Sequence, residues 1–121
     1  MKYLGTHILA ELHECDKDKL NDRAFIEKEL LKAIESSGAT IITYEFHKFF
    51  PIGVSGVVII AESHASIHTW PEYRYAALDI FTCSKNINPM KTLEIMKNKL
   101  DAGKVNFMNL KRGIFNNNIK D

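Results

Sequence analysis

Apolar residues recur at every second position along several stretches of the chain, which is the pattern of strands with one buried face. Residues 57–61 are instead continuously apolar, which is typical of a central strand. Residues 75–83 alternate so that Asp79, Phe81 and Cys83 share one face. The expected strands therefore cover residues 8–13, 42–47, 57–61, 75–83 and 105–110.

Two other stretches have the spacing of helices with one apolar stripe. The first carries its stripe between Ile26 and Ile34 and ends at Gly38. The second begins at Asn88, a capping residue followed by a proline, and ends near Gly103. We expect this second helix to bury Leu93, Met96 and Leu100.

The order of these elements, β-α-β-β-β-α-β with short gaps in the middle, favours an antiparallel sheet. The expected fold class is α+β: a two-layer α/β sandwich with two helices packed on one face of the sheet. The other face must then be polar or covered by a partner. Residues 1–121 form a single domain in this prediction, and residues 114–121 are expected to be frayed.

The composition and charge of the chain limit the classes of binding partner that we expect. A chain of 121 residues with 45% hydrophobic and 26% charged content has the composition of an ordinary globular domain. Sixteen basic and fifteen acidic side chains give a net charge of +1, so nothing favours nucleic acid or an anionic membrane. No apolar run approaches a membrane span of roughly 18 residues, and the start lacks a signal-peptide pattern, so we expect a cytoplasmic protein that binds a small molecule.

The most reactive side chains lie in residues 62–72, which hold two serines, two histidines and two glutamates directly after the apolar strand. In an extended chain Ser63 and His68 would be roughly 16 Å apart and on opposite faces. They can cooperate only if the chain reverses over residues 63–66, so that residues 67–70 return beside residues 57–61. Residues 63–66 contain no glycine, asparagine or aspartate, so we expect strain at the Glu62–Ser63 peptide.

The sequence ESHASIHTWPE at 62–72, with SGV at 55–57 and FTC at 81–83, resembles the short prokaryotic S-adenosylmethionine decarboxylases. The segments LGTH at 4–7, SGAT at 37–40 and FH at 46–47 also fit that family. The resemblance implies a homodimeric, pyruvoyl-dependent enzyme that converts S-adenosylmethionine to the aminopropyl donor for spermidine and other polyamines. It also implies self-cleavage between residues 62 and 63 into a 1–62 β chain and a 63–121 α chain.

The resemblance also assigns roles during cleavage. Ser63 attacks the carbonyl of Glu62 and becomes the pyruvoyl group, whose ketone later forms a Schiff base with the substrate amine. His68 accepts the α-proton of Ser63, and Ser55 is the candidate donor to the oxyanion. Cys83 is the proton donor in the decarboxylation.

For substrate binding, the resemblance assigns Glu72 to the ribose hydroxyls, and Phe49 is a candidate for stacking on the adenine. Neither a metal ion nor pyridoxal phosphate is required. Cys15 is expected to be a free buried thiol, and His64 has no role that the sequence identifies.

Alternatives from other classes remain open. The same machinery could act on arginine or ornithine, or the chain could be a non-enzymatic α/β dimerisation module. A third alternative is a metal-dependent hydrolase built on His64, His68 and Cys83. Each side chain also has an ordinary structural explanation when it is considered alone, such as a turn serine or a buried cysteine.

Overall fold

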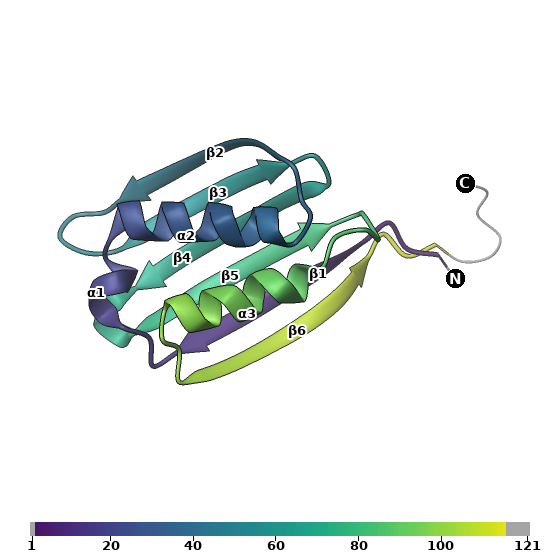
Figure 1. The fold of residues 1–121 in the computed structure, drawn as a ribbon. Helices are drawn as coiled ribbons and strands as arrows, with labels where there is room; N and C mark the ends of the chain where they lie inside the picture. The colour runs from purple at the N-terminus through teal and green to yellow at the C-terminus, as the bar shows by residue number, and fades with distance from the viewer. Residues whose placement is uncertain (1, 116–121) are drawn as a thin grey trace.

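The computed structural model describes residues 2–115. Within them a six-stranded sheet has the order β2-β3-β4-β5-β1-β6, and every neighbouring pair is antiparallel. The strands are β1 (Gly5–His13), β2 (Ile41–Lys48), β3 (Val54–Ile60), β4 (Ser63–Trp70), β5 (Tyr75–Thr82) and β6 (Lys104–Arg112). The predicted α+β sandwich is therefore confirmed (Figure 1).

The helices cover a single face of this sheet (Figure 1). The two predicted ones are α2 (Arg23–Ser36) and α3 (Pro89–Lys99). A third, α1 (Lys17–Leu20), was not predicted because four residues are too few for an apolar stripe. Its start is fixed by Asp16, whose carboxylate accepts hydrogen bonds from the backbone N–H groups of Asp18 and Lys19. None of the helices in residues 2–115 is long and apolar enough to cross a membrane.

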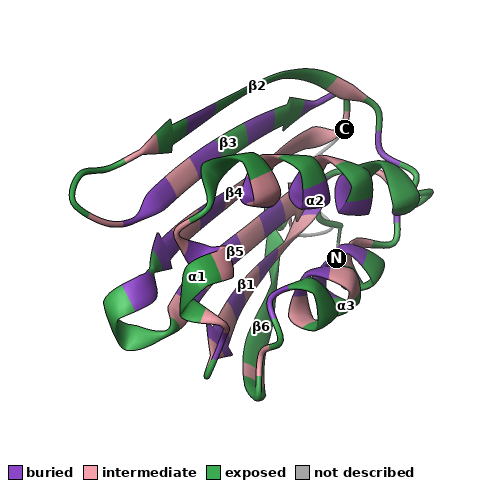
Figure 2. Ribbon diagram, turned by 60° about the vertical axis from the view of Figure 1, so that its left-hand side comes forward, coloured by how far each residue is buried: buried purple, intermediate pink, exposed green. Residues whose placement is uncertain are grey.

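The core lies between the helices and the covered face. Buried residues alternate with partly exposed ones along β1 and β5, as Figure 2 shows. Complete burial of a side chain such as Ile8, Leu30 or Leu78 contributes about 1.5–3 kcal/mol to folding. The predicted core residues of both helices are buried, with Ile26, Leu30, Ala33, Ile34, Leu93, Met96 and Leu100 all in the core.

The chain reverses earlier than the sequence predicted. The turn consists of Ala61 and Glu62, so that Ile60 pairs directly with Ser63. The prediction of a reversal over residues 63–66 is wrong, because these residues already belong to β4, where Ala65 faces the core. The predicted order of elements also lacked this strand, because the polar side chains at its start hide the alternation.

The uncovered face of the sheet exposes apolar side chains. Val57 and Ile59 are each 42% exposed there, so β3 is buried on one face only, although its sequence is continuously apolar. On the edge strand β2, Ile42 and Tyr44 are exposed rather than buried. A register shift between Ile41 and Thr43 interrupts the alternation that the sequence predicted. Most of the predicted frayed segment, residues 116–121, lies outside the described residues.

Candidate active site

Ser63 is the first residue of β4 and follows the two-residue turn. Its φ of 149° is positive, which is uncommon for any residue except glycine. Strand pairing holds Ser63 on both sides, against Ile60 of β3 and Thr82 of β5. Because the surrounding ladder imposes this conformation, the strain that the sequence predicted is stored next to the Glu62–Ser63 peptide.

The carbonyl oxygen of Glu62 accepts two hydrogen bonds from Cys83. The backbone N–H of Cys83 lies 3.0 Å away and its thiol also lies 3.0 Å away. The turn is anchored on its other side by Thr40, whose carbonyl accepts from the N–H of Ala61 at 2.9 Å. Two donors on one strained carbonyl form the arrangement that stabilises an oxyanion when that carbonyl is attacked.

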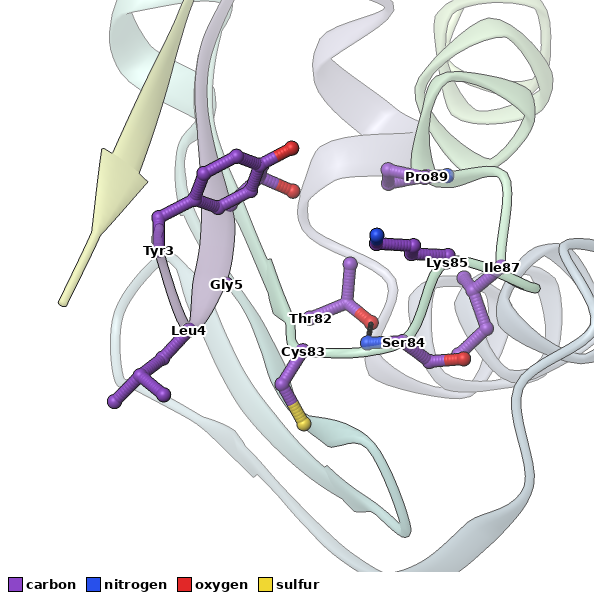
Figure 3. A pocket seen from close by; sticks show the side chains of 10 residues that line it. Tyr3, Leu4, Gly5, Thr82, Cys83, Ser84, Lys85, Ile87 and Pro89 are labelled. Carbon is purple, nitrogen blue, oxygen red and sulfur yellow. Dashed lines mark hydrogen bonds between the residues drawn. The ribbon is translucent and has the colours of Figure 1, made fainter. Parts of the chain in front are cut away.

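Gly5 allows β1 to approach the end of β5 closely enough to place Cys83. A methyl group at position 5 would lie 2.7 Å from the carbonyl oxygen of Thr82 and 3.3 Å from the Cα of Cys83. Beside Cys83 is a pocket of about 320 Å³. Figure 3 shows Tyr3 and Leu4 on one side of it, and on the other Cys83, Ser84, Lys85 and Ile87. The exposed thiol thus borders a space in which a small molecule can bind.

Ser55 and His68 form a second pair, on β3 and β4. They are direct partners in the strand register, and the Ser55 hydroxyl lies 2.8 Å from Nδ1 of His68. Both side chains are partly exposed on the uncovered face. The hydrogen bond fixes the orientation of the imidazole and leaves its other nitrogen directed away from Ser55.

Phe49 and Glu72 lie near this pair, just beyond the ends of their strands. Phe49 follows β2, is 46% exposed, and has its ring centroid 4.6 Å from that of His47. Glu72 is exposed in a short 3₁₀ turn, η1 (Pro71–Tyr73), directly after β4. An exposed aromatic ring and an exposed carboxylate at one end of the sheet fit the recognition of a nucleoside.

The candidate residues thus fall into two groups at opposite ends of β3 and β4. We call Glu62, Ser63 and Cys83 the Ser63 end. We call Phe49, Ser55, His68 and Glu72 the His68 end. Ser63 and His68 are five residues apart on one continuous strand, which corresponds to roughly 16 Å. The expectation that His68 reaches Ser63 within one chain is therefore wrong. Ser55 is paired with His68 and is equally distant from the Glu62 carbonyl, so it cannot donate to that carbonyl within its own chain.

Sequence analysis assigned no role to His64, yet its Nδ1 lies 3.3 Å from the hydroxyl oxygen of Ser63. The His64 ring contacts the edge of Phe81, and Phe81 stacks on His7 with a centroid separation of 5.3 Å. Burial lowers the pKa of His7 and outweighs the opposing effect of Asp79. No feature of the sequence alone could have indicated the contact between His64 and Ser63, because adjacent strand residues normally face opposite sides.

The remaining cysteine, Cys15, is a free buried thiol, as predicted. Burial raises its pKa to about 11. In the described part of the chain no three His, Cys, Asp or Glu side chains lie close enough together to hold a metal ion.

Comparison with known proteins identifies the family. Residues 6–113 match the family model described as S-adenosylmethionine decarboxylase. The S-adenosylmethionine decarboxylase proenzyme of Thermotoga petrophila is 52% identical over 93% of this chain and 87% of its own length. That of Methanococcus vannielii is 49% identical over 94% of this chain and 93% of its own.

A solved structure agrees with the sequence relatives. The crystal structure of the adenosylmethionine decarboxylase of Aquifex aeolicus VF5 superposes with a TM-score of 0.90, at 33% identity and with 100% of both chains covered. The chain therefore belongs to the S-adenosylmethionine decarboxylase family.

Proposed function

We propose that this protein is a self-processing, pyruvoyl-dependent decarboxylase that acts on S-adenosylmethionine in the cytoplasm and supplies the aminopropyl donor for polyamine synthesis. The observation that carries the proposal is the Glu62 carbonyl, which accepts two hydrogen bonds from Cys83 beside a serine of positive φ. The relatives' printed name, proenzyme, supports cleavage of the chain, and their printed substrate supports the reaction.

Cleavage begins when the Ser63 hydroxyl oxygen attacks the carbonyl carbon of Glu62. The oxygen of that carbonyl gains negative charge, which the N–H and the thiol of Cys83 stabilise. The C–N bond then breaks, so that an ester replaces the amide and residue 63 gains a free amine. The strained backbone at Ser63 favours this rearrangement, because the ester releases the conformation that the ladder imposes.

Removal of the α-proton of Ser63 completes the cleavage. The bond between Cβ and the ester oxygen breaks, which frees Glu62 as a carboxylate and leaves a dehydroalanine at position 63. Water then replaces ammonia and yields the pyruvoyl group. We assign the proton removal to His68, whose imidazole is oriented by Ser55.

His68 can act on Ser63 only from a second copy of the chain. The uncovered face carries exposed Val57 and Ile59, and its covering by a partner would remove this apolar surface from water. If the two-fold axis crosses this face midway between the two ends, each His68 end lies against the partner's Ser63 end. We therefore propose a homodimer whose two active sites each combine both chains.

In the decarboxylation the pyruvoyl group supplies a ketone that binds the substrate amine and accepts the electrons released with carbon dioxide. Cys83 stands beside the residue that forms this group and returns a proton to the substrate's α-carbon. Glu72 accepts hydrogen bonds from the ribose hydroxyls, and Phe49 stacks on the adenine. This aromatic and carboxylate pair favours a nucleoside substrate over arginine or ornithine.

Intact mass spectrometry of the purified protein tests the proposal. We expect fragments of residues 1–62 and 63–121, with the second fragment carrying a ketone that reacts with hydrazines. A Ser63→Ala variant should remain at full length and be inactive. Active protein with an unbroken 62–63 bond would refute the proposal.

A further inference from the structure

We propose that His64 is the base that takes the hydroxyl proton of Ser63 in the first step of self-processing. This inference rests on the proposed function, because it assigns a further residue to the same cleavage. It separates two proton transfers that one histidine would otherwise have to perform: the Oγ proton in the first step and the Cα proton in the second.

The contact depends on the unusual backbone at Ser63. Successive residues of a regular strand point to opposite faces, so a serine and the following histidine do not normally meet. At φ 149° the Ser63 hydroxyl instead lies 3.3 Å from Nδ1 of His64. The strained conformation thus has two effects: it exposes the Glu62–Ser63 peptide to attack and brings a base to the attacking hydroxyl.

Aromatic neighbours hold the His64 ring in this position. Its centroid lies 5.6 Å from that of Phe81 at an interplanar angle of 80°, and 6.3 Å from that of His7 at 79°. In the sheet, His64 lies between Ile59 of β3 and Phe81 of β5. The ring is therefore held in place by side chains of the neighbouring strands. Folding of the protein already fixes the position of the base, so no further entropy is lost when it acts.

The proposed step is balanced in protons and bonds. Nδ1 of His64 accepts the proton as the Ser63 oxygen forms its bond to the Glu62 carbonyl carbon, and the carbonyl oxygen becomes an oxyanion held by Cys83. When the C–N bond breaks, the imidazolium returns the proton to the departing nitrogen. His64 is unchanged at the end of the step, and the product is the ester.

The test compares His64→Ala with His68→Ala. Freshly purified proteins are followed by intact mass spectrometry, with and without hydroxylamine, which cleaves the ester. A general base ordinarily contributes about 10²- to 10⁴-fold to a rate, so we expect His64→Ala to cleave at least about 100-fold more slowly. It should remain an amide that hydroxylamine does not cut, because the block precedes the ester. His68→Ala should instead accumulate the hydroxylamine-sensitive ester.

Two further experiments separate proton transfer from packing, and a third checks folding. Added imidazole should restore part of the cleavage rate in His64→Ala, because the substitution leaves space beside the hydroxyl. His64→Gln, which keeps a polar side chain but cannot take the proton, should be as slow as His64→Ala. Thermal unfolding of both variants shows whether they are folded.

Cleavage of His64→Ala or His64→Gln at the normal rate would overturn the inference, and so would ester accumulation in either variant. Those results would leave the proposed function intact, provided that Ser63→Ala stays uncut. Failure of the proposed function has a different signature, which is activity in protein that retains the 62–63 bond.

Discussion

The Ser63 end and the His68 end differ in backbone conformation and in the roles that we propose for them. At the Ser63 end the ladder forces a serine to positive φ and directs two donors from Cys83 at one carbonyl. At the His68 end, Ser55 and His68 are ordinary paired strand residues joined by one hydrogen bond of 2.8 Å. The backbone at the proposed cleavage site is strained, whereas Ser55 and His68, which are proposed to assist, are positioned by regular strand pairing.

The same comparison explains why neither end is sufficient. In the proposed function, the Ser63 end holds the bond to be cleaved and the thiol. The His68 end holds the base for the α-proton and the side chains that bind the substrate. About 16 Å of strand separates them in one chain. The proposed two-fold dimer would unite the ends without any change in the fold of either copy.

The largest expected effect is at Cys83 of the Ser63 end. Cys83→Ala removes the thiol donor but leaves the backbone N–H on Glu62, so cleavage should slow by about 100-fold or less and still reach completion. Turnover of the cleaved variant should fall by about 10²- to 10⁴-fold, because the proton donor is missing. Mass spectrometry and release of labelled carbon dioxide measure the two rates. A fully active Cys83→Ala enzyme would remove Cys83 from the chemistry.

A smaller effect is expected at Glu72 of the His68 end. Glu72→Gln should raise KM by about 10- to 100-fold, since hydrogen bonds to a charged group contribute about 1.5–3 kcal/mol. Cleavage should proceed at the normal rate, because the proposed role of Glu72 is to bind the substrate and not to act on the 62–63 bond. The neighbouring Tyr73→Phe serves as the control and should leave KM unchanged. Slowed cleavage in Glu72→Gln would show that Glu72 takes part in self-cleavage as well as in substrate binding.

The smallest expected effect is a difference in reactivity toward thiol reagents between Cys83 and the buried Cys15. At pH 8 the folded protein should react rapidly at one thiol per chain, and this reactivity should be absent in Cys83→Ala. Cys15 should react only after unfolding, because its pKa of about 11 keeps the thiol protonated at that pH and burial blocks access. Rapid labelling of two thiols would contradict the burial of Cys15.

The sequence predicted most of the fold because alternation and apolar stripes directly reflect burial. Ile8, Ala10 and Leu12 are all buried as predicted, and Gly38, at φ 99°, follows the end of α2. The exceptions have local causes. Strand β4 begins with polar residues, and α1 is a four-residue helix that begins at the capping side chain of Asp16.

The geometry of the candidate site was less predictable than the fold. The sequence indicated that Ser63 and His68 lie far apart on an extended chain, but we expected a turn between them to resolve the separation. The turn precedes Ser63 instead, so the separation remains. The contacts of Cys83 with Glu62 and of His64 with Ser63 depend on one backbone angle and on strand register, which no local pattern encodes.

Co-expression of two inactive variants tests directly whether the two ends cooperate across copies. Ser63→Ala retains the His68 end and His68→Ala retains the Ser63 end, and each alone should fail to yield the pyruvoyl group. In mixed dimers one complete site remains, which combines Ser63 of the His68→Ala chain with His68 of the Ser63→Ala chain. We therefore predict that the His68→Ala chain is cleaved and yields residues 63–121 with a ketone at their start. The Ser63→Ala chain should stay whole. If the His68→Ala chain remained uncleaved in isolated mixed dimers, the account of a site shared between two chains would be wrong.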